Sequence, residues 1–414
     1  MQARTTATRT RRGKPGRTAI ALAGGGPLGG IYEIGALAAL DEAVDGLDFN
    51  DLDIYVGVSA GSFVAAGLAN GLRPLEMVRM FIESETAEEP FEPAMFLRPA
   101  IREYVGRTRM IPALVGNAVR RYIEDPAGRG VWDAFQRLSR ALPTGLFSGT
   151  EIEKFLRRLF AGPGRTNDFR ELRRKLYLVA TDLDSGRAVA FGSKGHDAVP
   201  ISTAIRASCA LPGLFSPVEI AGRHYVDGAL QKTLHASVAL KEGATLVFCI
   251  NPLVPYDDTQ LARKRGLPPL VSGGLPVVLG QTFRAMIHSR LATGMRKYDT
   301  EYANADVVLL EPQPGDAYLF YSSIFSYANR RKLCEHAYQR TRERLLARHR
   351  ELAPMLARHG ASLNLGVLRD RSLRLVRHDY QRRVVSAPQK TLARLADTLH
   401  DLERWLRLQR SGAA

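Results

Sequence analysis

The sequence predicts an α/β fold, in which a mainly parallel β-sheet carries helices on both faces. Two segments of the chain support this class. Residues 18–23 form a short apolar run typical of a buried strand, and residues 31–43 follow with a helical pattern. Residues 54–58 and 60–70 repeat this succession. Strands that are connected through helices lie parallel in one sheet, because each helix returns the chain to the edge where the strand began.

The same alternation continues in the middle of the chain. Thr150 and Glu153 have the spacing of a capping box, and they predict a helix that ends near Phe160. Three further strands are predicted from apolar runs, the first two joined by an Asp-Ser-Gly turn: residues 176–181, 188–191 and 245–250.

We expect three parts along the chain. Residues 1–17 predict a disordered basic tail, residues 18–320 the main domain, and residues 321–414 a basic helical C-terminal extension. Residues 88–143 lie within the main domain and combine helical patterns with frequent proline. They predict a helical insertion, which is either a lid or structural padding.

The net charge of +16 is concentrated at the two ends of the chain. Residues 1–17 carry six Arg or Lys and no acidic residue, and residues 330–414 carry 20 Arg or Lys against 8 Asp or Glu. Basic ends favour anionic partners such as phospholipid head groups, nucleic acid or acidic proteins. Solvated arginine-rich helix faces without such a partner are an equally simple interpretation.

The sequence predicts a cytoplasmic protein without a structural metal. Residues 1–17 contain no apolar segment typical of a secretory signal, and no apolar run is long enough to span a membrane. Cys209, Cys249 and Cys334 are too few and too far apart for a disulfide framework, and they lack the spacing of zinc ligands.

Residues 57–61 read Gly57-Val58-Ser59-Ala60-Gly61 and match the pattern G-x-S-x-G. A nucleophilic serine needs a sharp strand-to-helix turn so that its hydroxyl projects clear of the backbone, and the flanking glycines remove clashing Cβ atoms. The pattern is common by chance, but here it follows an apolar strand and opens a helix. This context predicts that Ser59 is a nucleophile on an elbow.

A glycine loop follows the first predicted strand and contains Gly24, Gly25, Gly26 and Gly29. Bare backbone amides in such a loop can stabilise the oxyanion of a tetrahedral intermediate. The spacing also fits G-x-G-x-x-G, the dinucleotide-binding pattern. That alternative requires an acidic residue at the end of the next strand. The next strand ends instead at Ser59, so we interpret the loop as an oxyanion hole.

The general base is predicted at Asp227. A serine hydroxyl needs a neighbour that accepts its proton, and Asp227 ends a predicted strand, followed by Gly228 and Ala229 in a tight turn. An ordinary Asp-Gly turn would leave the same signature.

In this order, the three motifs resemble those of the patatin-like phospholipases. The motifs are residues 24–29, 57–61 and 227–229. Two further similar segments lie between the second and third motifs, at residues 180–183 and 204–215. The resemblance covers roughly residues 18–310.

The resemblance implies a three-layer α/β/α patatin-like fold and a Ser59–Asp227 dyad that works without histidine or cofactor. It implies that the amides of Gly25 and Gly26 hold the oxyanion, and that the substrates are membrane or storage lipids, such as phospholipids or acylglycerols. The family usually has Arg or Lys before the last glycine of the loop, whereas Leu28 precedes Gly29 here. Either residues 24–29 or residues 25–30 therefore supply the functional glycines.

Two other functions stay open from the sequence. One is an α/β-hydrolase with a Ser-Asp-His triad that uses His224 or His235, although that fold places its elbow later in the chain. The other is a catalytically silent lipid-binding protein, which the intact motifs disfavour.

The predicted partner is a lipid substrate, with peripheral contact to an anionic membrane. Basic helical segments within residues 330–410 and the apolar residues 268–279 could dock at such an interface, or could pack on the core. We expect no nucleic-acid partner, because no helix-turn-helix, zinc or RNA-module signature accompanies the basic charge. The sequence leaves the oligomeric state open.

Overall fold

The computed structural model describes residues 16–83, 100, 144–257, 269–321 and 329–376 of the 414-residue chain. By its internal contacts the chain divides into residues 1–375 and 376–414, and the first of these parts is the fold described below. Most of the predicted basic tail and helical insertion, and the end of the C-terminal extension, lie outside the described residues. The domain boundaries stay a prediction.

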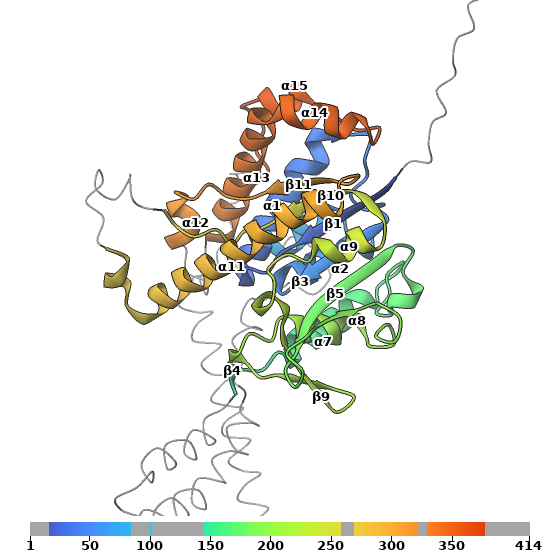
Figure 1. Ribbon diagram of the computed structural model, residues 1–414, viewed down its shortest axis with the longest axis vertical. Coiled ribbons are helices and arrows are strands. Elements are labelled where there is room, and N and C mark those ends of the chain that lie inside the picture. Colours follow the sequence, from blue (N-terminus) through green and yellow to red (C-terminus); the bar gives the residue numbers. More distant parts are fainter. Residues whose placement is uncertain (1–15, 84–99, 101–143, 258–268, 322–328, 377–414) are drawn as a thin grey trace, which may run out of the picture. The chain divides into compact units, whose positions relative to one another are not determined.

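A mostly parallel β-sheet forms the centre of the fold (Figure 1). From one edge to the other its strands are β11 (Asp306–Leu310), β10 (Ala244–Ile250), β1 (Arg17–Leu22), β3 (Ile54–Val58), β5 (Lys175–Asp182), β9 (Arg223–Asp227) and β8 (Val218–Ile220), and β6 (Ala188–Phe191) also pairs with β5. The first five strands are parallel, and the last three pair antiparallel.

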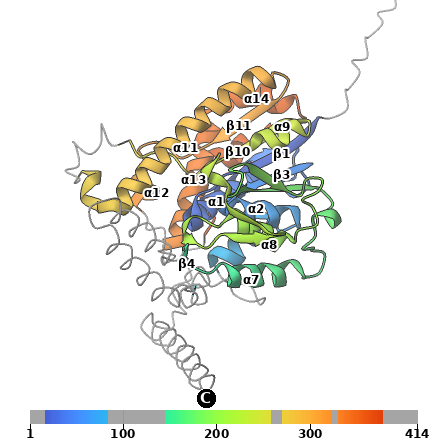
Figure 2. The ribbon, with the colours of Figure 1, turned by 60° about the horizontal axis from the view of Figure 1, so that its bottom comes forward.

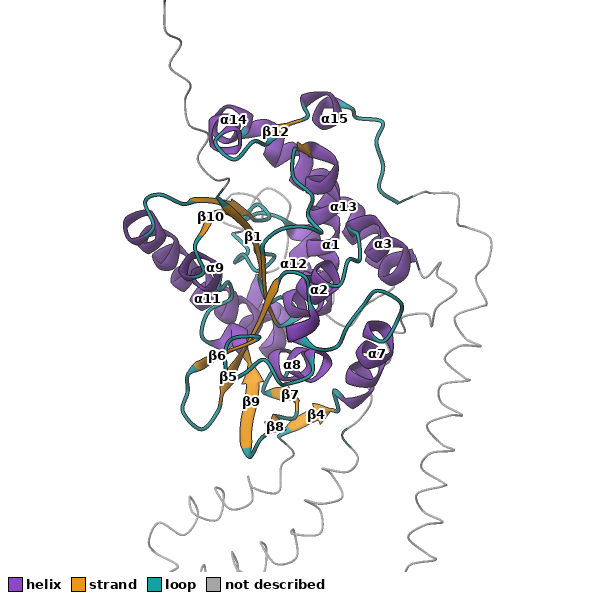
Figure 3. Ribbon diagram, turned by 90° about the vertical axis from the view of Figure 1, so that its right-hand side faces the viewer, coloured by secondary structure: helices purple, strands orange, loops and turns teal. Residues whose placement is uncertain are grey.

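Helices cover both faces of this sheet, and the alternation of side chains along β1 shows how. Ile20 and Leu22 point into the larger apolar cluster, while Ala19 and Ala21 point into a second one on the opposite face. The first face carries α1 (Gly26–Ala43), α2 (Ala60–Ala69) and α8 (Ile201–Ser208), and the second carries α9 (Ala236–Lys241) and α11 (Gly274–Glu301). Figure 3 shows the three layers, which confirm the predicted α/β/α fold.

The strands and helices predicted within residues 18–70 are confirmed, with small shifts at their ends. The first helix begins at Gly26 rather than at residue 31, because Pro27 suits the first turn of a helix and extends it into the glycine loop.

The helix α7 (Thr150–Phe160) is confirmed, but the predicted capping box is wrong. The N-cap residue is Gly149, and no side chain caps it. Glu153 turns instead toward α8, where it accepts hydrogen bonds from Thr203 Oγ1 at 2.8 Å and Arg206 Nη1 at 2.9 Å. Tertiary partners therefore replace the local contact that the spacing suggested.

Helix α13 (Arg330–Ala347) lies beside α1 (Figures 1 and 2). A Cβ atom on Gly35 of α1 would lie 2.3 Å from the carbonyl oxygen of Cys334, so the two helices approach closely only because residue 35 is glycine. Leu333 and Tyr338 are buried in the same contact. The apolar face of α13 is thus packed on the core and is not presented to a membrane.

The remaining described elements are short. They are β2 (Val44–Asp45) paired with β12 (Ser362–Leu363), β4 (Gly145–Phe147) paired with β7 (Gly213–Phe215), the helices α3 (Pro74–Met77), α12 (Ala317–Tyr321), α14 (His349–Ala357) and α15 (Leu365–Arg369), the π-helix η1 (Val78–Glu83), and the 3-10 turns η3 (Phe169–Glu171), η4 (Gly228–Leu230) and η5 (Leu270–Gly273).

Candidate active site

Ser59 occupies the sharp turn between strand β3 and helix α2. Its φ of 52° lies in the left-handed region, which a residue with a side chain rarely adopts. Such strain is typical of a nucleophile elbow, where it lifts the hydroxyl away from the backbone. The side chain is 7% exposed, at the carboxyl edge of the parallel strands.

Two glycines make this turn possible because the backbone around it is crowded. A Cβ on Gly57 would lie 2.5 Å from the carbonyl oxygen of Gly61, and a Cβ on Gly61 would lie 2.6 Å from the carbonyl oxygen of Ala23. Both distances are shorter than any ordinary contact. The predicted roles of Gly57 and Gly61 in the elbow therefore agree with the geometry.

Two further serines hold the backbone of Ser59. The amide of Ser59 donates to Ser208 Oγ at 2.8 Å, and the same Ser208 hydroxyl donates to the Val179 carbonyl at 2.6 Å. The Ser62 hydroxyl donates to the carbonyl of Ser59. Both supporting serines are completely buried. Sequence reasoning missed them, since a serine in a helix gives no signal of a distant backbone partner.

Asp227 is the last residue of β9, and its carboxylate lies beside the Ser59 hydroxyl, which lowers the pKa of the carboxyl. The amide of Ala229 donates to Asp227 Oδ1 at 2.8 Å, which fixes the carboxylate at the start of turn η4. Gly228 is required in this turn, because a Cβ there would lie 2.3 Å from the carbonyl oxygen of Val179. The structure thus brings together the two residues that the sequence predicted as nucleophile and base.

The pKa of Asp227 is raised to about 6, because the carboxyl is buried and only 2% exposed. The interactions with Ser59 and Ala229 lower the pKa of Asp227, but burial raises it by more. At neutral pH the group is therefore ionised, yet it binds a proton more readily than an ordinary aspartate. These are the properties of a general base for a serine hydroxyl.

The glycine loop lies directly against the elbow. A Cβ on Gly24 would lie 3.1 Å from the Cβ of Ser59 and 2.9 Å from the Cβ of Ala229. The loop follows β1, the elbow follows the neighbouring parallel strand β3, and both therefore meet at one edge of the sheet. The sequence left two possible sets of glycines, residues 24–29 and residues 25–30. The first set begins beside Ser59.

The backbone amides of the glycine loop differ in whether they already donate a hydrogen bond to a backbone carbonyl. The amide of Gly24 donates to the Thr233 carbonyl at 3.2 Å, and that of Gly29 donates to the Gly25 carbonyl at 3.0 Å. Within the described part of the chain, the amides of Gly25 and Gly26 donate to no backbone carbonyl. They also begin α1, whose N-terminal dipole favours negative charge. The geometry favours Gly25 and Gly26 as donors and leaves Gly24 and Gly29 structural roles.

Neither histidine of the alternative triad faces the dyad. His224 has a half-exposed side chain beside Asp184, with 3.9 Å between His224 Nδ1 and Asp184 Oδ2. His235 is buried, burial lowers its pKa to about 4, and its Nε2 has no hydrogen-bond partner among the described residues. In the same residues, no hydrogen bond or ion pair joins either imidazole to Ser59 or Asp227. The Ser-Asp-His alternative is therefore disfavoured.

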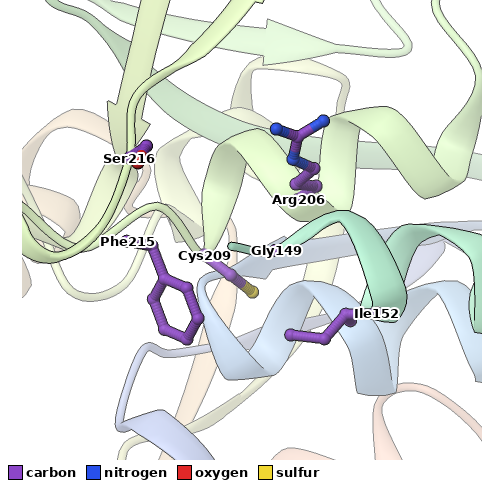
Figure 4. A pocket seen from close by; sticks show the side chains of 6 residues that line it. All are labelled: Gly149, Ile152, Arg206, Cys209, Phe215 and Ser216. Atoms are coloured by element: carbon purple, nitrogen blue, oxygen red, sulfur yellow. The ribbon is translucent and has the colours of Figure 1, made fainter. Parts of the chain in front are cut away.

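A small recess lies beside α8 and is lined by neither Ser59 nor Asp227 (Figure 4). Ile152, Cys209 and Phe215 direct their side chains into it, and the guanidinium of Arg206 points away from them. The sulfur of Cys209 lies 3.8 Å from the hydroxyl oxygen of Ser62 in α2. The recess is lined mainly by apolar atoms.

The described part of the chain holds no group of three or more His, Cys, Asp or Glu side chains arranged to bind a metal ion. In the same residues, none of the helices combines the length and the apolar character that a membrane span needs.

The fold and the site define a class of protein: an α/β/α protein with a serine on a nucleophile elbow and a buried carboxylate within its reach. A family model described as Patatin-like phospholipase matches residues 20–240, more than half of the chain. The chain therefore belongs to the patatin-like phospholipase family, and the predicted family is confirmed.

Several solved structures resemble the chain. VipD from Legionella pneumophila has a TM-score of 0.34 at 16% identity, and the match covers 78% of this chain and 67% of VipD. The type III effector protein ExoU has a TM-score of 0.34 at 15% identity, over 81% of this chain and 53% of ExoU. The heterodimeric ExoU–SpcU complex from the type III secretion system of Pseudomonas aeruginosa has a TM-score of 0.24 at 18% identity, over 67% of this chain and 52% of that chain. The chain thus spans about half the length of the ExoU chains that it matches.

Proposed function

We propose that this protein is a serine lipid acyl hydrolase that cleaves acyl esters through a Ser59–Asp227 dyad and an acyl-enzyme. Membership of the patatin-like phospholipase family supports a lipid hydrolase. The observation that carries the proposal is the position of the Ser59 hydroxyl, on a strained elbow, beside a buried carboxylate whose pKa is raised to about 6. A serine used only for structure would not need a strained backbone beside a base.

In the first half of the reaction, Ser59 Oγ attacks the acyl carbonyl carbon while Asp227 accepts the hydroxyl proton. Negative charge develops on the carbonyl oxygen, where the amides of Gly25 and Gly26 and the N-terminus of α1 stabilise it. The intermediate then expels the lipid alcohol, which takes the proton from Asp227. The product of this half is an ester between Ser59 and the acyl group.

In the second half, water replaces the alcohol. Asp227 accepts a proton from that water, whose oxygen attacks the acyl carbonyl, and the oxyanion again lies at the glycine loop. Collapse of this intermediate returns the proton to Ser59 and releases the fatty acid. One carboxylate thus serves as base and acid in turn, so the mechanism requires neither histidine nor cofactor.

The substrate class is expected to be a membrane or storage lipid, such as a phospholipid or an acylglycerol. Membership of the patatin-like phospholipase family supports this substrate class.

The test combines a covalent probe with a lipid digest. A fluorophosphonate probe should label the purified protein at Ser59, and an untargeted digest of a lipid extract should show loss of specific ester lipids. Ser59→Ala should abolish both signals, whereas Ser193→Ala, at an ordinary turn serine bonded to Ala190, should keep them. Wild-type protein that is neither labelled nor active on any lipid would favour the silent lipid-binding alternative.

A further inference from the structure

Six large apolar side chains are exposed along η5 and the first half of α11. We call them the α11 stripe, and their exposed fractions range from 39% to 71%: Val271, Leu275, Val278, Leu279, Phe283 and Met286. Single exposed apolar residues are ordinary, but a contiguous series marks an interaction surface.

The stripe occupies one face of the helix. Leu275, Leu279, Phe283 and Met286 follow one another at intervals of three or four residues, which aligns them along α11. This spacing is the one expected of an amphipathic helix whose apolar side has no partner.

The opposite face of the same helix is anchored to the protein. Gln281 Oε1 accepts a hydrogen bond from the amide of Tyr256 at 3.1 Å, and Gln281 Nε2 donates to its carbonyl at 2.7 Å. The guanidinium of Arg284 lies 4.7 Å from the centre of the Phe320 ring. Because these contacts fix the rotation of the helix, the stripe is directed away from the body of the protein.

The charge of the whole chain complements an anionic surface. Helix α11 contains four Arg or Lys against two acidic residues, Asp299 and Glu301, and the chain carries a net charge of +16. A positively charged protein with an exposed apolar helix face is suited to the surface of an anionic bilayer.

The second half of α11 connects this surface to the active site. Leu291 and Tyr298 are buried against the sheet, so this half belongs to the core. Arg290 Nη1 donates to the carbonyl of Leu230 at 3.0 Å, at the end of the turn that starts with Asp227. One rigid helix therefore links the exposed stripe to the turn that holds the base.

We propose that the α11 stripe docks on the surface of an anionic lipid bilayer and thereby brings the dyad to substrate in the membrane. The delivery of substrate rests on the proposed function, but the docking itself does not. The net charge of +16 favours an anionic lipid surface over a second copy of this chain, which carries the same positive charge.

The experiment uses the full chain and a triple variant, Leu275→Ser/Phe283→Ser/Met286→Ser. Co-sedimentation is measured with vesicles of phosphatidylcholine alone and with added phosphatidylglycerol. The wild type should bind the anionic vesicles at least tenfold more tightly than the neutral ones, and the triple variant should lose about tenfold or more of that binding. Leu75→Ser, at an exposed leucine of α3, should bind like the wild type.

Two activity measurements separate docking from catalysis. The triple variant should hydrolyse a soluble short-chain ester at the wild-type rate but vesicle lipid at least tenfold more slowly. Ser59→Ala should lose both activities and still bind anionic vesicles. Unchanged vesicle binding by the triple variant would overturn the proposal. So would a wild-type dimer, detected by light scattering, that the triple substitution dissociates without an effect on vesicles.

Discussion

The hydroxyl of Ser59 lies beside the buried carboxylate of Asp227, and among the described residues no hydrogen bond or ion pair joins either side chain to a histidine. The two residues come from different strand ends, β9 and β3, which the intervening strand β5 joins in one sheet. Burial makes the carboxylate more basic, and in the proposed mechanism this carboxylate takes the role that an imidazole has in a triad. The following predictions test this relationship and the backbone around it.

Replacing Asp227 with Asn should reduce kcat for a soluble ester by about 10²–10⁴-fold, the usual contribution of a positioned general base. An amide keeps the size of the side chain and its bond to the Ala229 amide, but it cannot accept the proton of Ser59. His224→Ala is the matched control, because its half-exposed ring lies beside Asp184 and should be dispensable. A loss of activity in His224→Ala as large as in Asp227→Asn would contradict the dyad.

The activity should depend on pH through Asp227. The base must be ionised, and its pKa is raised to about 6 by burial. We expect kcat/KM for a soluble ester to rise about tenfold per pH unit below pH 6 and to level off above it. The measurement is a pH profile between pH 4.5 and 8.5. A flat profile across that range would show that another group accepts the proton.

Replacing Gly24 with Ala should reduce activity, because the new methyl group would press on Ser59 and Ala229 at about 3 Å. The second substitution Ala229→Gly removes one of these contacts. It should recover thermal stability more than activity, since the contact with Ser59 remains. Gly294→Ala in α11, where a Cβ meets no atom within 4 Å, is the control and should stabilise the helix by up to about 1 kcal/mol. Kinetics and thermal unfolding of the wild type and of these three variants test the prediction, and full activity of Gly24→Ala would contradict it.

Glu33 of α1 should make the protein less stable as the pH rises. Its carboxyl is fully buried, neither oxygen has a hydrogen-bond partner among the described residues, and the nearby amide of Ala23 already donates to Ile250. Burial therefore raises the pKa of Glu33 well above its ordinary value. The folded protein keeps the proton at a pH where the unfolded chain has released it, so stability is complete below about pH 4.5 and decreases above it.

The variant Glu33→Gln should remove this dependence. Its free energy of unfolding, measured by urea titration, should exceed that of the wild type at pH 8 and approach it at pH 4.5. An advantage of the variant that is the same at both pH values would refute the assignment of a buried neutral acid.

The order of motifs along the chain predicted the layered sheet and the family, and both are confirmed. It also predicted a nucleophile at Ser59 and a base at Asp227, whose roles stay a prediction. Such motifs can be read from sequence because strand-to-helix turns and glycine loops are local features of adjacent residues. The predicted capping box at Thr150 was wrong, because Glu153 bonds to Thr203 and Arg206 on α8, which are distant in sequence.

Only the tertiary structure decided which loop amides lack a backbone acceptor, which serines hold the elbow and where α11 leaves its apolar side exposed. Ser208 meets Ser59 across the fold, and Arg290 meets Leu230, through contacts that no local pattern encodes. The raised pKa of Asp227 belongs to this second group as well. A residue's chemistry is local, but its burial depends on side chains that only the folded chain brings around it.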